Sequence, residues 1–147
     1  MEIVFFETME EDELILSKIL SKNREINPKF IKEPLTEKNF TLAENAEVIS
    51  IFLGTTPNEA LLKKLPNLRL ITTRSTGFDH IDLTAAKKAK ITVCNVPAYG
   101  SRTVAEFTFS LILGLTRKTF LAYKQIKNNH DFNISHFEGF DLQGKTI

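Results

Sequence analysis

Apolar runs of strand length alternate with amphipathic stretches of helix length over the first two thirds of this chain. Five runs have the composition of buried strands, at residues 3–6, 29–31, 48–53, 68–73 and 91–94. Stretches with helical spacing lie between them, at residues 12–20, 57–65 and 83–88. Strands that alternate with helices form βαβ units, which build a mostly parallel sheet with helices on both faces. The pattern therefore predicts an α/β fold, a flavodoxin-like doubly wound parallel sheet of five strands.

Three stretches have the form Thr-x-x-Glu, which is typical of a helix N-terminus with a capping box. They begin at Thr8, Thr56 and Thr103. In this box the threonine hydroxyl accepts a hydrogen bond from the glutamate N–H, and the carboxylate accepts one from the threonine N–H. Pro57 supports the second box, because proline is favoured at the first helical position. The first two boxes follow predicted strands directly, so we expect these helices to begin at the carboxyl edge of the sheet, where such sheets bind ligands.

The helix predicted over residues 103–120 is apolar on nearly all sides. A helix with that distribution must be buried on both sides, which predicts a second domain or a second subunit against it. We therefore divide the chain into residues 1–100, which hold the sheet, and residues 101–147, which hold the helices. A predicted turn at Gln143-Gly144 precedes Lys145-Thr146-Ile147, which has the character of a strand start. A strand that starts at the last residue suggests a chain truncated from a longer one.

Charge and composition argue against several functional classes. The chain has 19 basic and 18 acidic residues, a net charge of +1, and no block of either sign. The overall charge therefore does not favour binding to a nucleic acid or to a membrane surface. The N-terminus lacks the basic region of a signal peptide, and the apolar stretch 104–115 is well short of the ~20 residues of a membrane span. Cys94, the one cysteine, lies in an apolar run and is interpreted as a small buried hydrophobe. These features predict a cytoplasmic protein.

Residues 70–82 bring a serine, a histidine and two aspartates together after an apolar run, which invites a catalytic interpretation. Ser75 lacks the G-x-S-x-G context of a nucleophile elbow. His80 lies at the start of a helix whose expected N-cap is Asp82, so a solvated or capping histidine is favoured. The other two histidines, His130 and His136, have no Cys, Asp or Glu partner at ligand spacing, and no metal site is predicted.

The residues that follow the predicted strands are better candidates for a binding site. Gly77 can adopt a positive φ, which would point the N–H groups of Thr76 and Gly77 into one concavity that suits an anion. An ordinary turn glycine is the alternative. Phe52 ends the third apolar run and Tyr99 follows the fifth, so both should point toward the same edge of the sheet. Packing in the core or at its rim is the alternative for these two aromatic residues.

Three motifs, in this order and spacing, resemble the D-isomer-specific 2-hydroxyacid dehydrogenase family. They are RSTGFDHID at 74–82, VCNVPAY at 93–99 and TVAEF at 103–107. The closing LQGKTI resembles the family's lead-in to its Rossmann domain, which binds NAD. The resemblance implies the substrate domain of a dimeric, D-lactate dehydrogenase-like oxidoreductase that transfers a hydride between NAD(H) and a small 2-oxo or 2-hydroxy acid.

The resemblance also implies roles for particular residues. In the family, main-chain amides hold the substrate carboxylate and aromatic side chains border the substrate. Val104 matches a position that packs near the nicotinamide, and Thr103 would cap the helix that carries it. The substrate-binding residues implied are Thr76, Gly77, Tyr99 and Phe52, and the cofactor-binding residues implied are Val104 and Thr103. The family's catalytic arginine, glutamate and histidine match no residue here, so no catalytic residue is assigned.

The family's G-x-G-x-x-G fingerprint is not found in this sequence. None of the six glycines forms a G-x-G pair, so no phosphate-binding loop of that kind can be built from them. We therefore expect this chain to be inactive by itself. The alternative is a non-catalytic module that binds a small acid or a protein partner, as a homodimer or an oligomer that exchanges its helices. A phosphoacceptor domain is excluded, because it needs an aspartate where this chain has Phe52-Leu53-Gly54.

Overall fold

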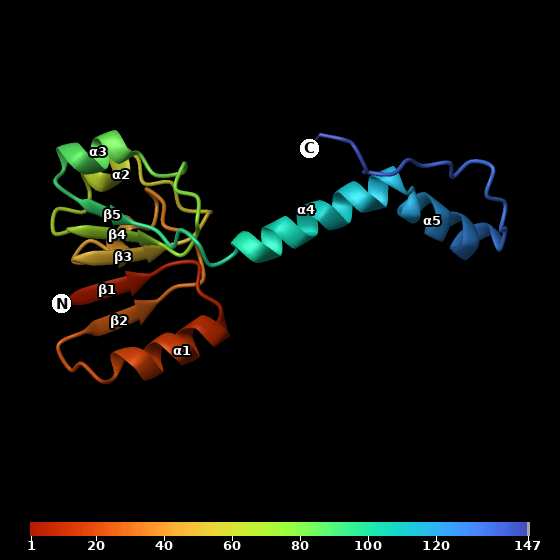
Figure 1. The fold of residues 1–147 in the computed structure, drawn as a ribbon. Helices are drawn as coiled ribbons and strands as arrows, with labels where there is room; N and C mark the ends of the chain where they lie inside the picture. Colours follow the sequence, from red (N-terminus) through yellow and green to blue (C-terminus); the bar gives the residue numbers. More distant parts are fainter. Residues whose placement is uncertain (147) are drawn as a thin grey trace. The chain divides into compact units, whose positions relative to one another are not determined.

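The computed structural model describes residues 1–146 and contains a sheet of five strands, all parallel. The strands are β1 (Glu2–Phe5), β2 (Asn27–Phe30), β3 (Val48–Ile51), β4 (Leu70–Thr73) and β5 (Thr92–Cys94). Their order across the sheet is β2-β1-β3-β4-β5 (Figure 1). This order confirms the predicted flavodoxin-like, doubly wound sheet.

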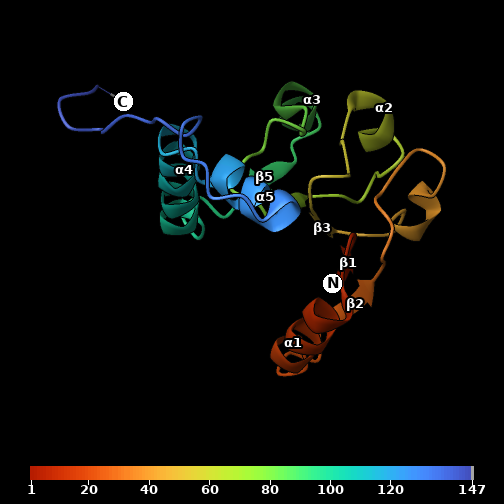
Figure 2. The same cartoon turned by 90° about the vertical axis from the view of Figure 1, so that its right-hand side faces the viewer.

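The helices of the first part of the chain cover both faces of this sheet. They are α1 (Glu10–Leu20), the 3₁₀ helix η1 (Phe40–Leu42), α2 (Glu59–Leu62) and α3 (Leu83–Lys88). The chain steps from β1 to β2 in one direction and then passes back over β1 to β3, β4 and β5. Because crossovers between parallel strands are right-handed, this reversal puts α1 on one face and α2 and α3 on the other (Figure 2).

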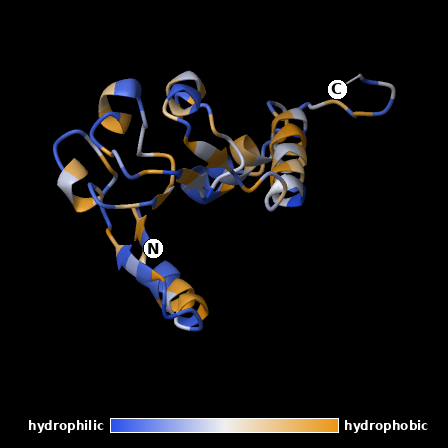
Figure 3. Cartoon of the chain, turned by 90° about the vertical axis from the view of Figure 1, so that its left-hand side faces the viewer, coloured by the Kyte–Doolittle hydropathy of each residue, from blue (hydrophilic) through white to orange (hydrophobic). Residues whose placement is uncertain are grey.

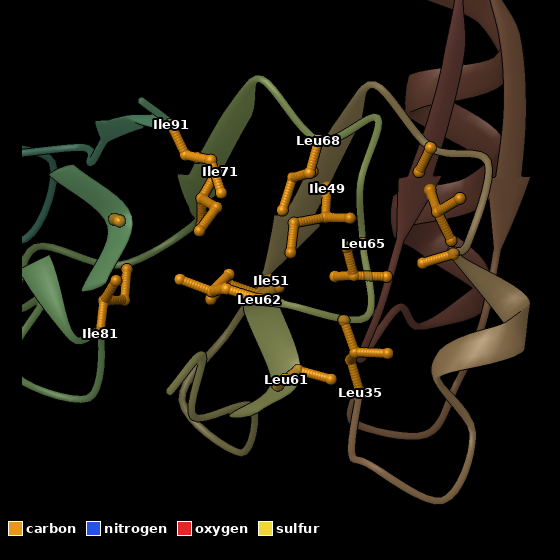
Figure 4. Close-up of a cluster of buried hydrophobic side chains, with 14 of the residues drawn as sticks. Leu35, Ile49, Ile51, Leu61, Leu62, Leu65, Leu68, Ile71, Ile81 and Ile91 are labelled. Atoms are coloured by element: carbon orange, nitrogen blue, oxygen red, sulfur yellow. The ribbon is translucent and has the colours of Figure 1, made fainter. Parts of the chain in front are cut away.

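The core lies between the sheet and the face covered by α2 and α3. Val4 pairs with Ile49, Ile49 with Ile71 and Ile71 with Val93, so one row of branched side chains crosses four strands on the same face. Leucines of the α2 region pack onto this row, and Ile81 and Ile91 extend it (Figure 4). Each fully buried aliphatic side chain contributes about 1.5–3 kcal/mol to folding. This packing holds the strand ends in fixed positions relative to one another.

The predicted cap of α1 is wrong by one residue. The N-cap is Met9, whose N–H donates to Asp12 Oδ2 at 2.9 Å. The hydroxyl of Thr8 donates instead to the carbonyl of Ile31 at 3.2 Å. An acidic residue stands at each of positions 10–13. A helix that starts one residue later than predicted therefore still has a carboxylate that accepts from the N–H of its N-cap residue.

The predicted cap of α2 is wrong as well. Asn58 caps this helix, because its side chain accepts a hydrogen bond from Leu61 N at 2.8 Å. Thr56 is therefore not the cap, and Pro57 precedes the helix instead of opening it. Asparagine is at least as good a cap as threonine, and Asn58 directly precedes the first helical residue, Glu59. The predicted cap of α3 is confirmed, since Asp82 Oδ1 accepts from Ala85 N at 2.8 Å.

The chain divides into two compact units, Met1–Tyr99 and Gly100–Ile147. The second unit contains α4 (Ser101–Thr116) and α5 (Thr119–Asn129). The N-cap of α4 is Gly100, which makes the predicted cap at Thr103 wrong and places that residue inside the helix. Much of α4 consists of hydrophobic residues (Figure 3). Its exposed large apolar side chains are those of Val104, Phe107, Phe109, Leu111, Leu113 and Leu115. A domain or subunit that covers them stays a prediction.

Two further predictions concern the sheet edge and the end of the chain. Cys94 is exposed, so its assignment as a buried residue is wrong. The reason is that β5 is an edge strand, and alternate residues on it face away from the core. The turn at Gln143-Gly144 forms, but Lys145 and Thr146 are not in a strand, and Ile147 lies outside the described residues. No helix within residues 1–146 is both long and apolar enough to cross a bilayer.

Candidate functional site

A hollow of about 320 Å³ lies at the carboxyl edge of the sheet, where β1 and β3 are neighbours. The direction of strand progression reverses between these two strands, and this is where sheets of this order bind ligands. Six residues line the hollow: Glu7, Met9, Asp12, Phe52, Arg74 and Tyr99. The predicted pair Phe52 and Tyr99 is thus brought together, with 37% and 68% of their surface exposed. The volume is at the lower end of the range for small-molecule sites.

Other hollows of similar size contain none of the predicted residues. One of about 380 Å³ lies by the start of α2, lined in part by Thr36 and Asn58. Another of about 400 Å³ lies beside α5 in the second unit. Neither is at the point where the strand order reverses, so the hollow at Phe52 is the better candidate.

The turn after β4 presents backbone N–H groups rather than carbonyls. Asn95 Nδ2 donates to the carbonyl of Thr76 at 2.8 Å, and Ser75 Oγ donates to the carbonyl of Gly77 at 2.7 Å. Within residues 1–146, the amides of Thr76 and Gly77 donate to no protein acceptor, and both residues are exposed. Two adjacent donors of this kind suit a carboxylate. Neither residue lines the hollow at Phe52.

Gly77 does not adopt the positive φ that was expected of it. Among glycines in the described part of the chain, Gly144 is the one with a positive φ. Side-chain bonds from Ser75 and Asn95 shape the turn instead, and they require no left-handed residue. A Cβ on Gly77 would meet only Asp79 Oδ2, at 3.8 Å, so the protein itself leaves open space there.

Arg74 is a site residue that sequence reasoning missed. It directly follows β4, and its side chain is half-buried beside the ends of β1 and β3. Its Nη2 donates to the carbonyls of Phe6 at 2.7 Å and Glu7 at 2.9 Å, and its Nη1 donates to Ser50 O at 3.2 Å and Ser50 Oγ at 3.1 Å. Burial lowers the pKa of the guanidinium, while Asp12 and Glu7 oppose that shift. The arginine therefore joins three strands at the edge that forms the site.

Glu7 was missed too, although it follows β1 by two residues as Phe52 follows β3 by one. The signal that could have found both Glu7 and Arg74 is their place in the sequence. Each is a charged residue just after a buried strand, and such residues lie at the ligand-binding edge of a parallel sheet.

The charges around the hollow suit an uncharged ligand group better than an anion. One guanidinium, that of Arg74, faces two carboxylates, those of Glu7 and Asp12. Both carboxylates already accept hydrogen bonds from backbone N–H groups. A ligand carboxylate would be repelled by them, so the amides of Thr76 and Gly77 are the more favourable place for it.

The polar side chains within residues 70–82 serve the turn and the following helix. Ser75 is buried, with its Oγ 2.6 Å from Thr73 Oγ1, and it has no base in nucleophile geometry. His80 Nε2 lies 3.4 Å from the same threonine hydroxyl, and Asp82 caps α3. In residues 1–146 no three His, Cys, Asp or Glu side chains cluster closely enough to hold a metal ion.

The two residues implied near the cofactor belong to the second unit. Thr103 and Val104 lie in the first turn of α4, and both are exposed. Val104 has 65% of its surface accessible and belongs to the row of exposed apolar side chains along α4. Their cofactor-binding role stays a prediction.

Comparison with known proteins gives consistent results over most of the chain. Residues 3–133 match the model of the D-isomer specific 2-hydroxyacid dehydrogenase catalytic domain. A 2-hydroxyacid dehydrogenase homolog of Schizosaccharomyces pombe is 36% identical over 100% of this chain and 44% of its own length. An aromatic 2-oxoacid reductase of Clostridium sporogenes is 38% identical over 72% of this chain and 32% of its own.

The fold comparison agrees. A D-lactate dehydrogenase of Aquifex aeolicus, solved with NAD and lactic acid, superposes with a TM-score of 0.87 at 33% identity, covering 95% of this chain and 41% of that one. The chain thus spans less than half the length of the relatives it matches. Since a family model covers most of its residues and a full-coverage relative shares over a third of them, the chain belongs to the D-isomer specific 2-hydroxyacid dehydrogenase family, as an oxidoreductase domain.

Proposed function

We propose that this chain is the substrate-binding part of an oxidoreductase that transfers a hydride between NAD(H) and a small 2-oxo or 2-hydroxy acid. The observation that carries the proposal is the pair of exposed amides at Thr76 and Gly77, which donate to no acceptor within residues 1–146. They follow β4, on the same sheet edge as the hollow at Phe52 and Tyr99. Two N–H donors at a sheet edge are well matched to a carboxylate.

The distribution of charge predicts how such an acid would bind. Its carboxylate would accept hydrogen bonds from Thr76 N and Gly77 N. The rest of the molecule would extend toward the hollow, where Phe52 and Tyr99 offer apolar surface and the carboxylates of Glu7 and Asp12 disfavour a second negative charge. The proposal therefore favours monocarboxylic 2-oxo acids over dicarboxylic ones. The named relatives include both a D-lactate dehydrogenase and an aromatic 2-oxoacid reductase, which fits a variable side-chain end.

The test is an NMR titration of the 147-residue chain with pyruvate. We expect the amide resonances of Thr76 and Gly77 to shift, and oxaloacetate, with its second carboxylate, to bind more weakly. In the Gly77→Ala variant the added Cβ stands in open space, so the fold should persist while a ligand on the amides meets the methyl group. Loss of the two hydrogen bonds should weaken binding by about tenfold or more.

Gly100→Ala is the matched control, because a Cβ at Gly100 would meet nothing within 4 Å and a Cβ at Gly77 would make only an ordinary contact with Asp79 Oδ2 at 3.8 Å. Equal pyruvate binding by the wild-type chain and both variants would show that the amides do not hold the acid. So would pyruvate-induced shifts confined to the second unit.

NAD(H) is proposed as the cofactor of a longer protein that would contain this chain. The described residues offer no strand, glycine-rich loop and helix in the arrangement that holds a dinucleotide, so no residue here is assigned to its phosphates. NAD(H) would supply or accept the hydride when bound. Thr103 and Val104 remain the residues proposed to bind the cofactor, with Val104 near the nicotinamide. This chain alone should not oxidise NADH with pyruvate, and the absorbance of NADH followed over time is the direct check.

A non-catalytic module that binds a small acid or a partner is the second candidate. The observation that favours it is the apolar surface of the second unit, which continues from α4 into α5 with Phe120, Leu121 and Tyr123 exposed. Exposed apolar area of this kind marks an interaction surface. We propose a homodimer, or an oligomer that exchanges these helices, and light scattering at micromolar concentration should give at least twice the monomer mass. Leu115→Glu should shift the mass toward the 16.7 kDa of one chain. A wild-type chain that is a clean monomer would contradict the proposed assembly.

A further inference from the structure

The backbone of Glu7 adopts an unusual conformation that local structure does not require. Its φ is 56°, in the left-handed region that non-glycine residues seldom occupy. Three other non-glycine residues in the described chain have positive φ: Lys90, Lys118 and His130. Those three stand at or beside helix ends, where such a conformation is common. Glu7 stands between a strand and a helix instead, and conformations of this kind persist where the surroundings over-determine them.

Contacts on both sides of the residue fix this conformation. Glu7 N donates to Glu33 O at 3.3 Å, and Glu7 O accepts from Arg74 Nη2 at 2.9 Å. The side chain is thereby aimed at the loop that joins β3 to α2. That loop lies 45 to 48 residues further along the chain.

The Glu7 carboxylate accepts three hydrogen bonds from this loop. Oε2 accepts from Phe52 N at 3.0 Å and from the hydroxyl of Thr55 at 2.7 Å, and Oε1 accepts from Gly54 N at 2.6 Å. Thr55 is fully buried, and its hydroxyl also accepts from Leu35 N at 3.0 Å, which fixes the direction in which it donates. Bonds to an ionised acceptor are about twice as strong as neutral ones. The loop therefore forms a carboxylate-binding site that a residue of the same chain fills.

Gly54 allows the carboxylate to come this close. A Cβ on Gly54 would lie 2.7 Å from Glu7 Oε1, while the next nearest group outside Glu7, Pro34 Cβ, would be 3.4 Å away. An alanine here would displace the carboxylate and touch little else. The chain thus offers two independent ways to break the same contact, by removing the carboxylate or by pushing it out.

We propose that Glu7 is a positioning residue, an internal ligand of the β3–α2 loop that holds Phe52 at the edge of the hollow. Phe52 lies on this loop, and both residues line the hollow. This inference rests on the proposed function in one respect, that Phe52 borders the variable end of the substrate. In this proposal Glu7 holds the loop and also contributes a carboxylate to the wall of the hollow, so it controls which acids fit rather than the chemistry.

The loop is tested first without any ligand, in the full chain, by a double-mutant cycle of Glu7→Ala and Gly54→Ala. Alanine at position 7 keeps the Cβ, so the backbone strain is retained while the carboxylate and its Cγ methylene are lost. Each single variant should move the amide and ring resonances of Phe52. Glu7→Ala should also move the amide resonance of Gly54 and speed its exchange by about tenfold or more. In the Glu7→Ala background, Gly54→Ala should add little, because the atom it collides with is gone.

Chemical rescue separates a carboxylate-binding site from a general loss of structure. Formate should return the Phe52 and Gly54 resonances of the Glu7→Ala variant toward their wild-type positions. In the wild-type chain it should leave those two resonances unchanged, because the Glu7 carboxylate already fills the loop site. Glu44→Ala, which removes an exposed carboxylate from the same unit, is the control and should leave these resonances in place. Fully additive effects in the cycle, or a Glu7→Ala variant that ignores formate, would overturn the proposal.

Selectivity between two acids tests whether the position of the β3–α2 loop affects ligand binding in the hollow. The ratio of affinities for pyruvate and phenylpyruvate should change by about fivefold or more in the Glu7→Ala variant, while both acids still shift Thr76 and Gly77. An unchanged ratio with an altered loop would overturn the positioning of Phe52. If the wild-type chain binds neither acid, the proposed function fails, and the cycle and the rescue still decide whether Glu7 holds the loop and Phe52.

Discussion

Replacing Arg74 by methionine should destabilise the first unit substantially, and the structure allows the size of the effect to be worked out. The guanidinium makes four hydrogen bonds, two of them at 2.7 and 2.9 Å to the carbonyls that follow β1. Hydrogen bonds to charged groups contribute about 1.5–3 kcal/mol each when fully buried. Arg74 is only half-buried, so water can replace part of what is lost. Methionine keeps the apolar stem, so we expect a loss of about 2–3 kcal/mol in total.

A positive charge at position 74 should not by itself restore the lost free energy of unfolding. Arg74→Lys retains a cation, but a single ammonium cannot reach Ser50 and the β1 carbonyls as the two guanidinium nitrogens do, so about half of the loss should remain. The assay is urea unfolding followed by amide exchange in β1 and β3, with the denaturant slope unchanged. For a unit of this size, 1 kcal/mol corresponds to a shift of about 4–8 °C in the melting temperature.

Arg69→Met is the matched control. The side chain of Arg69 is 81% exposed and lies 3.9 Å from Glu47, so its removal should change stability by less than about 0.5 kcal/mol. Equal losses from Arg74→Met and Arg69→Met would refute the reasoning, because then the four bonds contribute no more than an exposed ion pair. Complete rescue by lysine would show that charge, and not the geometry of the guanidinium, is what matters.

Two further predictions concern the local structure. Asp82→Ala removes the cap of α3 and should lower the free energy of unfolding by about 1 kcal/mol, whereas Asp79→Ala, on the exposed turn, should stay within about 0.5 kcal/mol in the same urea titration. Cys94 is exposed, so one equivalent of a thiol reagent such as DTNB should react with the native chain, and a thiol that becomes reactive only on unfolding would contradict this.

The fold could be predicted because the information it needs is local and repetitive. Apolar runs of strand length, separated by helical stretches, indicate a parallel sheet, and the handedness of crossovers leaves few strand orders. The same reasoning placed Phe52 and Tyr99 at one edge, since residues that follow parallel strands share that edge. The hollow that both residues line is what the strand order requires.

The caps of α1, α2 and α4 and the exposure of Cys94 could not be predicted, for two different reasons. At the start of α2, Thr56 and Asn58 are both good caps, and the preference between them amounts to only a few tenths of a kcal/mol. The packing of the helix against the sheet decides such a case, and the local sequence does not determine that packing. The exposure of Cys94 depends on β5 being an edge strand, which follows from the strand order and not from the apolar run around the residue.

The positions of Glu7 and Arg74 after strands mark them as residues of the sheet edge, but their partners lie beyond local prediction because each acts on a distant segment. Together the two residues form a connected path. Arg74 donates to the carbonyl of Glu7, and the carboxylate of Glu7 holds the loop that carries Phe52. Arg74 makes no hydrogen bond to that loop itself. If the path is real, Arg74→Met should accelerate amide exchange at Gly54 by freeing the Glu7 backbone, and it should do so far less in the Glu7→Ala background, where the carboxylate is already lost. Equal acceleration in both backgrounds would mean that Arg74 acts on the loop by loosening the whole unit, and the two residues would then be independent supports of the same edge.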